Sequence, residues 1–392
     1  MNSFNFVTAG ESHGKGLVVT IEGMPAGLPV NVASINHQLW RRQQGYGRGG
    51  RMKIEKDEAE IISGIRHGRT LGSPIALLIR NRDWENWQDV MAADEREFAD
   101  EKQARRLTRP RPGHTDLAGG LKFDTHDLRD ILERASARET AARVAAGALA
   151  RALLNQLGVE VASHTCMIGG VPDEPIAASW DQIFNLPDDS PLRCVDVEAQ
   201  ARMIALIDQT TAARDTLGGI FEIVAKGVVT GLGSHTQWSR KLDGRLAQAI
   251  MSIPAVKAVE IGAGVQVSRR TGSQVHDEIG YDTADHRFTR PTNRAGGLEG
   301  GITTGEELRV KGHLKPISTL RKPLASVDVV TKAESAAAFE RSDIVAVPAA
   351  GVIGEAMVTM VLADAAREKF GGDSLSEMLR NYQGYVEQMR QY

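Results

Sequence analysis

The segment RPRPGHTD, residues 109–116, combines residue types that can bind anions and move protons. Guanidinium groups grip phosphate and carboxylate oxygens in a fork, and a histidine can carry a proton near neutral pH. The two prolines fix φ and remove backbone donors, which excludes a helix interior or a central strand. We therefore predict a stiff loop that presents Arg109, Arg111 and His114 at set positions. A solvated basic turn is the alternative that the segment alone leaves open.

Other polar clusters elsewhere in the chain have the same character. They are AGESHGKG at residues 9–16, GYGRGGRMKIEKDE at residues 45–58 and RSD at residues 341–343. Glycine backbone that carries cations, as in the second cluster, is typical of an anion-binding or lid loop. A mobile surface loop remains the alternative for that cluster.

The motifs that the chain lacks narrow the chemistry. The sequence contains no GxxxxGK[ST], no GxGxxG after an opening strand, no HExxH and no GxSxG. What remains is a site that binds polyanions through several arginines and uses a histidine or a carboxylate for proton transfer. The residues alone thus indicate phosphate-ester or carboxylate substrates as a class, and leave open a phosphate-bearing cofactor.

The overall composition excludes several classes of protein. The 392 residues carry a net charge of −3, which argues against a dedicated nucleic-acid binder. The two cysteines, Cys166 and Cys194, form neither a disulfide framework nor a metal-ligand spacing, so we expect no metal. No stretch approaches about 18 consecutive apolar residues, and the N-terminus lacks a basic region followed by an apolar run. We therefore expect a soluble, cytoplasmic protein with no membrane span.

The elements between the polar clusters must position them. Hydrophobic patterning predicts a helix over residues 31–44 and strands at residues 17–24, 59–65 and 73–79. The strongest helix signal runs from about residue 127 to 157, and its alanine-rich part is typical of a helix buried between layers. Ser136 is either an N-cap there or, with its neighbours, part of an anion site at a helix N-terminus.

The second half of the chain continues the mixture of strands and helices. Alternation at residues 218–228 predicts a strand with one buried face, and a helix at residues 243–253 precedes a strand at residues 255–264. An amphipathic helix follows the RSD cluster and is stopped by two glycines at positions 371 and 372. We predict a peripheral C-terminal helix over about residues 373–392. Without a Pro/Ser-rich linker or a clear repeat, we expect one large domain over residues 1–392.

Eight motifs occur in order along nearly the whole chain, and together they resemble those of the chorismate synthase family. They are AGESHG (9–14), RRQQGYGRGGRM (41–52), RPRPGHTD (109–116), ERASARETAARVAAGA (133–148), DTLGG (215–219), NRAGGLEGG (293–301), KPIST (315–319) and RSDIVAVPAAGVIGEAM (341–357). Eight ordered motifs are far more specific than any one of them.

The resemblance implies a fold and a reaction. The reaction is the elimination of phosphate from 5-enolpyruvylshikimate 3-phosphate to give chorismate, the last step of the shikimate pathway of aromatic amino-acid biosynthesis. The enzyme would be a carbon–oxygen lyase that needs reduced FMN although no net redox change occurs. The implied fold is α+β, a β-α-β sandwich with a buried helical layer between two antiparallel sheets, assembled as a homotetramer.

The resemblance also assigns roles to residues of this chain. His13 would donate a proton to the leaving phosphate, His114 would help to protonate or stabilise the reduced flavin, and Asp343 would relay the proton removed from the substrate. Arg42 and Arg48 match positions associated with NADP and with the mouth of the substrate site. The implied FMN contacts are Arg134, Ala135, Ser136, Pro254, Ala255, Gly300, Lys315, Pro316, Ile317, Ser318, Thr319 and Arg341. Arg48, Arg134 and Arg341 are the arginines expected around the substrate's phosphate and carboxylates.

Two other functions remain as alternatives. One is a phosphate-handling enzyme of the same general chemistry that binds no flavin. The other is an RNA-binding protein that uses its Arg/Gly loops, which the net charge of −3 and the single aromatic of those loops, Tyr46, oppose. Because no reductase domain or dinucleotide fingerprint is visible, we expect FMN to be reduced by a separate flavin reductase, with NADPH as the candidate ultimate reductant.

Overall fold

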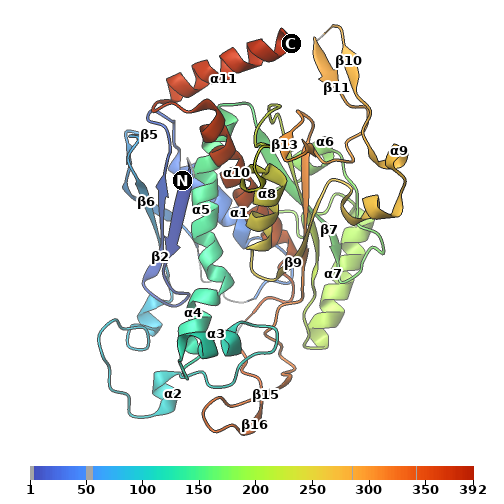
Figure 1. Ribbon diagram of the computed structural model, residues 1–392. Helices are drawn as coiled ribbons and strands as arrows, with labels where there is room; N and C mark the ends of the chain where they lie inside the picture. Colours follow the sequence, from blue (N-terminus) through green and yellow to red (C-terminus); the bar gives the residue numbers. More distant parts are fainter. Residues whose placement is uncertain (1–3, 50–55, 285, 341) are drawn as a thin grey trace.

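Two four-stranded antiparallel sheets form the frame of the protein (Figure 1). The structure is a computed structural model that describes residues 4–49, 56–284, 286–340 and 342–392. In spatial order, the first sheet contains β1 (Asn5–Ala9), β2 (Gly16–Glu22), β6 (Ile75–Arg80) and β3 (Ala59–Ser63). The second contains β7 (Glu160–Ile168), β8 (Gly219–Lys226), β14 (Leu308–Leu314) and β9 (Val256–Ile261). All pairings within both sheets are antiparallel.

Helices pack against the inner faces of both sheets. They are α1 (Val32–Gln43), α5 (Thr140–Asn155), α8 (Leu242–Met251) and α10 (Val347–Phe370). Helix α5 contacts β2 and β6 of the first sheet, α10 contacts β7 and β8 of the second, and the two helices pack on each other. Figure 1 shows α5 and α10 between β2 and β7, which places the predicted alanine-rich helix in the interior.

Local sequence explains where several of these elements begin and which face they bury. Helix α1 begins after Asn31, whose side chain accepts a hydrogen bond from the backbone N–H of Ala33, and it confirms the helix predicted over residues 31–44. On β2, the alternating residues Leu17, Val19 and Ile21 are fully buried, so this strand turns one apolar face toward the helices.

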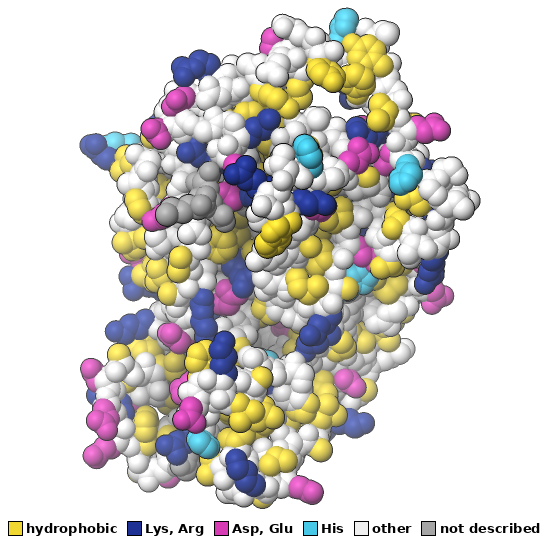
Figure 2. Space-filling view, viewed as in Figure 1, with side chains coloured by type: hydrophobic (Ala, Val, Ile, Leu, Met, Phe, Trp, Pro, Cys, Tyr) yellow, Lys and Arg dark blue, Asp and Glu magenta, His cyan; other side chains and the backbone are white. Residues whose placement is uncertain are grey.

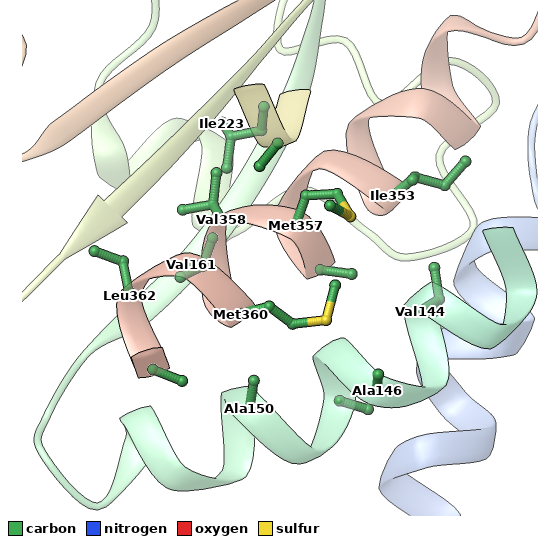
Figure 3. Close-up of a cluster of buried hydrophobic side chains, with 14 of the residues drawn as sticks. Val144, Ala146, Ala150, Val161, Ile223, Ile353, Met357, Val358, Met360 and Leu362 are labelled. Atoms are coloured by element: carbon green, nitrogen blue, oxygen red, sulfur yellow. The ribbon is translucent and has the colours of Figure 1, made fainter. Parts of the chain in front are cut away.

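The contact between α5 and α10 depends on small residues. A Cβ atom at Gly147 would lie 2.4 Å from the Cβ of Ala356, so the two helix backbones meet without room for a side chain at position 147. Figure 3 shows larger side chains around this contact, with Met360 of α10 lying over the stretch of α5 that carries Ala146 and Ala150. This packing joins the two central helices into one core.

Two predicted burial patterns are wrong. Strand β8 was expected to bury one face, but six consecutive residues are buried because α10 covers one face and the cluster around Trp180 and Val224 covers the other. Helix α10 was expected to be amphipathic, but it is buried nearly all round. It is long and apolar enough to cross a membrane, yet 94% of its most apolar window is buried inside the fold, as in the core helix of a globular protein.

The helix predicted over about residues 127–157 is broken. It consists of α4 (Arg129–Ala135), the 3₁₀ turn η3 (Ala137–Glu139) and α5. Ser136 separates α4 from η3 with extended backbone (ψ 139°), and its side chain accepts a hydrogen bond from the N–H of Arg138. Ser136 is therefore a cap, and the break turns α4 away from α5 toward the polar loops.

The remaining elements are short or peripheral. They are β4 (Ile65–Arg66), β5 (Arg69–Thr70), η2 (Trp84–Asn86), α2 (Glu101–Ala104), α3 (Asp116–Phe123), α6 (Trp180–Phe184), α7 (Val197–Ala212), η4 (Trp238–Arg240), η5 (Gly264–Arg269), α9 (Gly272–Val275), β10 (Gly280–Asp282), β11 (Arg287–Thr289), β12 (Leu298–Glu299), β13 (Ile302–Thr303), β15 (Ala325–Val327), β16 (Glu334–Ala336) and α11 (Leu375–Arg390). Helix α11 buries only Leu375 and Met378, and α3, α4, β15 and β16 lie together at the lower end in Figure 1.

Candidate active site

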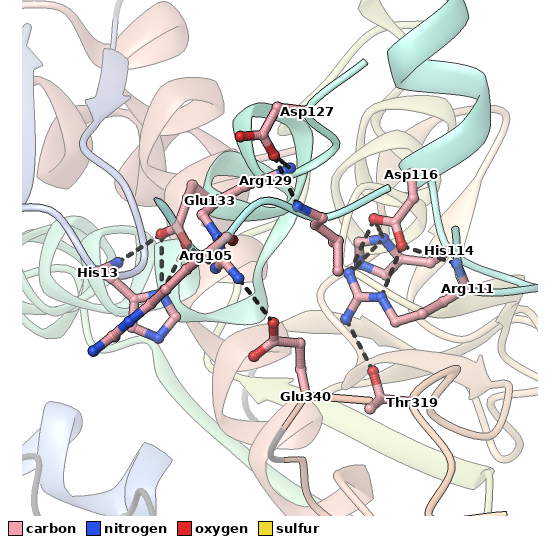
Figure 4. Close-up of polar contacts among 11 residues, drawn as sticks. His13, Arg105, Arg111, His114, Asp116, Asp127, Arg129, Glu133, Thr319 and Glu340 are labelled. Carbon is pink, nitrogen blue, oxygen red and sulfur yellow. Dashed lines mark hydrogen bonds and ion pairs between the residues drawn. The ribbon is translucent and has the colours of Figure 1, made fainter. Parts of the chain in front are cut away.

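Contacts with Glu133 hold the AGESHG turn, residues 9–14, against helix α4 (Figure 4). The Nδ1 atom of His13 lies 2.8 Å from Oε1 of Glu133, and the backbone N–H of His13 donates to Oε2 at 2.8 Å. The N–H of Ser12 donates to the carbonyl of Glu133. On one face of the His13 imidazole lies the ring of Trp87, with centroids 3.9 Å apart. The histidine is thus held by a carboxylate and an aromatic face.

The charge of Glu133 is maintained by its partners. Burial disfavours the carboxylate, but the hydrogen bonds from His13 outweigh it and lower the pKa of Glu133 below its usual value. Arg129, one turn earlier on α4, lies 3.2 Å from Glu133 and also 3.2 Å from Glu340. This arginine connects the His13 pair to the segment that leads into the RSD motif.

The RPRPGHTD loop contains a second histidine–carboxylate pair. His114 Nδ1 lies 2.6 Å from Oδ1 of Asp116, and Arg111 donates to both oxygens of the same carboxylate at 2.8 and 3.0 Å. Burial opposes ionisation of Asp116, yet the hydrogen bonds from His114 and Arg111 lower its pKa overall. Arg111 is buried and also donates to the hydroxyl of Thr319. We expected Arg111 to present its charge for anion binding, but in the structure it neutralises Asp116.

Asp343 of the RSD motif contacts the glycine-rich segment near residue 48. The backbone N–H of Gly49 donates to Oδ1 of Asp343 at 2.6 Å, and Nη1 of Arg48 lies 3.4 Å from Oδ2. The hydroxyl of Ser342 donates to the carbonyl of Thr319. The RSD motif therefore touches both the glycine-rich segment and the KPIST segment. Residues 50–55 of the predicted anion-binding loop lie outside the described residues.

Arg42, Arg48 and Arg138 form a group of mostly buried cations beside Asp343. Arg138 binds both oxygens of Asp57 at 2.6 Å, whereas Nη1 of Arg42 lies 3.6 Å from that carboxylate. Burial, together with the charges of Arg138 and Arg48, lowers the pKa of Arg42 to about 10 although Asp57 opposes the shift. Within this group of described residues, three guanidinium groups face two carboxylates. Among the described residues, Nη1 of Arg42 is buried without a hydrogen-bond partner, which leaves it able to donate to an anion. Figure 2 shows a hollow between the main body and the lower end, with Lys and Arg side chains at its edges.

The KPIST segment lies against the RPRPGHTD loop. Nζ of Lys315 donates to the carbonyl of Gly113, and a Cβ atom at Gly113, where φ is +78°, would lie 3.3 Å from that Nζ. Burial and the nearby charge of Lys257 lower the pKa of Lys315. The backbone N–H of Lys315 donates to the carbonyl of Ala255, which has a left-handed φ of +70°. The KPIST segment thus brings residues 254–255 close to the loop that carries His114.

The family profile of chorismate synthase matches residues 4–366 of the chain. The chain belongs to the chorismate synthase family. A chorismate synthase of Solibacter usitatus is 56% identical over 389 residues, covering 99% of both chains. One of Symbiobacterium thermophilum is 56% identical over 387 residues, covering 98% of this chain and 99% of the relative. A solved crystal structure of chorismate synthase matches with a TM-score of 0.79 and 42% identity, covering 99% of both chains.

Membership of the chorismate synthase family establishes the class of the enzyme. The chain is a lyase of the shikimate pathway and of aromatic biosynthesis, and its reaction is that of the family, in which 5-enolpyruvylshikimate 3-phosphate loses phosphate to become chorismate. The fold is α+β, with helices and antiparallel sheets as in the matching structure.

Some positions assigned from the chorismate synthase motifs lie apart from this hydrogen-bonded frame. Arg134 is exposed, and its guanidinium donates to the carbonyls of Thr8 and Gly10. Ala135 is the last residue of α4. Gly300 lies in the turn between β12 and β13, and no hydrogen bond among the described residues joins it to the other motifs. Arg341 lies outside the described residues.

Sequence reasoning about the chorismate synthase motifs overlooked several residues that organise the site. Glu133 and Asp116 stand inside the quoted motifs. An acid within the same set of motifs as the candidate histidines was therefore a signal that could have identified both residues. Trp87 comes from residues 81–108, which resemble a surface excursion in sequence, yet it is 9% exposed and stacks on His13. Asn81 donates to the carbonyls of Glu11 and Gly14, and no local pattern predicts this contact.

A separate buried cluster on the outer face of the second sheet has metal-ligand residue types. His164, Cys166 and Glu222 have ligand atoms within 4.8 Å of one another. The same Glu222 oxygen that faces His164 at 3.1 Å also accepts a hydrogen bond from Arg309 at 3.1 Å. A cation at that oxygen would face a guanidinium, so we assign this cluster to hydrogen bonding inside the chorismate synthase fold.

Proposed function

We propose that the motifs assembled around His13, His114 and Asp343 form the site that binds reduced FMN and 5-enolpyruvylshikimate 3-phosphate together and eliminates phosphate. One observation carries this proposal. The three candidate proton-handling residues come from distant parts of the sequence and are joined by short chains of contacts. Glu133 and Arg129 link His13 to Glu340, and Arg111 and Thr319 link His114 to Ser342, next to Asp343.

The residues present fit the anionic groups of both ligands. The substrate has two carboxylates and a phosphate, and FMN has one phosphate. Arg42, Arg48 and Arg138 lie around Asp57 and Asp343, and among the described residues one side-chain nitrogen of Arg42 is buried without a hydrogen bond. Arginine remains charged throughout a reaction and binds oxyanions in a fork, which suits this group to anion binding. We assign Arg42 and Arg48 to the mouth of the substrate site and to any contact with NADP.

The proposed proton movements follow from the positions of the side chains. His13 donates a proton to the leaving phosphate, while Asp343 relays the proton that the substrate loses, so that the substrate releases a proton and phosphate with no net change in electrons. His114 helps to keep the flavin in its reduced, correctly protonated form. Reduced FMN, when bound, would lend electron density to the breaking C–O bond. The KPIST segment, Ala255 and the cap at Ser136 support backbone contacts to the flavin, and Arg134, Ala135, Pro254, Gly300 and Arg341 complete the proposed set.

Anaerobic turnover tests this proposal directly. The protein would be mixed with 5-enolpyruvylshikimate 3-phosphate and dithionite-reduced FMN, and chorismate absorbance and phosphate release would be followed. We expect His114→Ala to lose about 10²-fold or more in kcat, the usual scale for a group that acts in proton transfer. His126→Ala, which changes an exposed histidine, should keep wild-type activity. Full activity of His114→Ala would remove His114 from the mechanism.

The reductant and the assembly are separate parts of the proposal. We propose that a separate flavin reductase supplies reduced FMN, with NADPH as the ultimate reductant, and aerobic turnover of the isolated protein with NADPH and FMN alone would contradict this. We also propose that the chain is one β-α-β sandwich domain with α11 at its periphery and that it assembles as a cytoplasmic homotetramer. Light scattering would then give four times the 42.4 kDa of one chain, and a monomer would exclude the tetramer.

A further inference from the structure

We propose that Glu133 is the positioning residue of His13, and that it fixes the tautomer and the ring orientation from which His13 delivers its proton. This inference rests on the role proposed above for His13 and names the residue that makes that role possible. Because the Glu133 carboxylate faces Nδ1, that nitrogen carries hydrogen in the pair, and proton delivery takes place from Nε2.

The geometry of the contact fixes the ring in two ways. The Glu133 carboxylate binds the backbone N–H and Nδ1 of the same histidine, so main chain and side chain are held by one group. The Trp87 ring stacks on the imidazole at an interplanar angle of 25°, which restricts rotation about the side-chain torsions. Trp87 is itself held by a hydrogen bond from its Nε1 to Asp83. The His13 side chain is 12% exposed and Glu133 is 1% exposed, so water competes little for this contact.

The two histidine–carboxylate pairs differ in how their carboxylates are bound. Asp116 receives Arg111 on both oxygens, and Nη2 of Arg111 lies 3.1 Å from Nδ1 of His114. That guanidinium neutralises Asp116 and lies against the His114 ring. Glu133, by contrast, receives Arg129 at one oxygen only. Both Glu133 oxygens lie within hydrogen-bond distance of Nδ1 of His13, and Oε2 also accepts from the His13 backbone N–H.

Two arginines lie near the His13–Glu133 pair. Arg129 divides its charge between Glu133 and Glu340, each at 3.2 Å. Arg129 and Arg105 both lie over the Trp87 ring, 5.1 and 4.2 Å from its centroid, so the aromatic ring faces them. The Glu133 contact and the stacked Trp87 ring thus present His13 as the donor of the leaving-group proton.

A double-variant cycle in the complete enzyme tests the positioning role. Glu133→Gln would be made in the wild type and in His13→Ala, with Glu174→Gln, at an exposed position outside the motifs, as the control. With reduced FMN and substrate, we expect Glu133→Gln to lower kcat about 10²-fold with little change in KM, and to cost nothing further in His13→Ala.

Histidine ring nitrogen NMR provides a readout that does not depend on turnover. With His13→Ala used to assign the signal, wild-type His13 should show hydrogen on Nδ1, and Glu133→Gln should show a mixture of tautomers. An equal loss of kcat from Glu133→Gln in both backgrounds, or an unchanged tautomer in that variant, would overturn the inference. If His13→Ala were fully active, the proposed role of His13 would fail, whereas the NMR signal would still decide whether Glu133 orients the ring.

Discussion

The carboxylate of Asp343 accepts a 2.6 Å hydrogen bond from the backbone N–H of Gly49, a residue 294 positions earlier in the chain. The same carboxylate lies 3.4 Å from Arg48. The glycine-rich segment therefore both orients the candidate proton relay and places a cation beside it. Substitutions at Asp343 and at Gly49 can therefore distinguish the loss of the Asp343 carboxylate from a change in its position.

Asp343→Asn should remove the proton relay while keeping its position, because the asparagine Oδ1 can still accept from Gly49. We expect kcat to fall about 10²–10⁴-fold, the range for loss of a general acid or base. Anaerobic turnover with reduced FMN measures this, and flavin titration checks that the site remains intact. Activity within threefold of the wild type would assign the proton relay to another group.

Gly49→Ala should disturb the position of Asp343 without changing any charge. The new Cβ would lie 2.9 Å from the carbonyl oxygen of Ser342 and 3.3 Å from the Asp343 carboxylate, so the two segments must separate. A misplacement of about 1 Å can cost about 10²-fold in rate, and we expect a kcat loss of that order with normal thermal stability. Gly244→Ala, where a Cβ meets nothing within 4 Å, is the matched control and should be fully active.

Gly147→Ala should destabilise the core by about 1–3 kcal/mol, because the new methyl group overpacks the contact with Ala356 of α10. Urea unfolding measures the change. Gly384→Ala places the same methyl group in open space on α11, and there it should be neutral or stabilising by up to about 1 kcal/mol. Equal stability of the two variants would mean that α5 and α10 do not pack this closely.

Glu355 of α10 is the centre of a buried ionic network that should make stability depend on acid pH. Arg41 binds both of its oxygens, and Arg151 and Ser163 bind it as well. Burial opposes the charge, but Arg41 and Arg151 outweigh it and lower the pKa of Glu355 from 4.5 to about 2. A carboxylate with a depressed folded-state pKa stabilises the fold fully above its unfolded value. Its contribution is therefore lost as pH falls from 4.5 toward 2.

Glu355→Gln removes the buried counter-charge that Arg41 and Arg151 share, although Arg41 keeps Asp188, so we expect a loss of about 3–5 kcal/mol at pH 7 and a weaker pH dependence between pH 4.5 and 2. Urea unfolding at several pH values measures both effects. Asp188→Asn, which changes a 41% exposed partner of Arg41, should cost far less. An unchanged acid limb in Glu355→Gln would exclude this network as its cause.

Local sequence was sufficient for several parts of the fold and the site. Asn31 supplies its own helix cap, the residues Leu17, Val19 and Ile21 alternate within one strand, and His13, His114 and Asp343 stand in motifs whose order indicates the family. These signals act over a few residues, or depend on residue identity alone. They can therefore be recognised without knowing what packs against them.

The burial of α10 and β8 and the partners of the site residues required the tertiary structure. Whether a strand has one buried face depends on what covers its other face, and for β8 that is a cluster around Trp180, distant in sequence. Arg111 looked like an anion-binding group until the fold placed Asp116 against it. Trp87 stacks on His13 across 74 positions of sequence. Residue types and spacing determined the family and the chemical groups of this protein, but only three-dimensional packing decided which of those groups pair with one another.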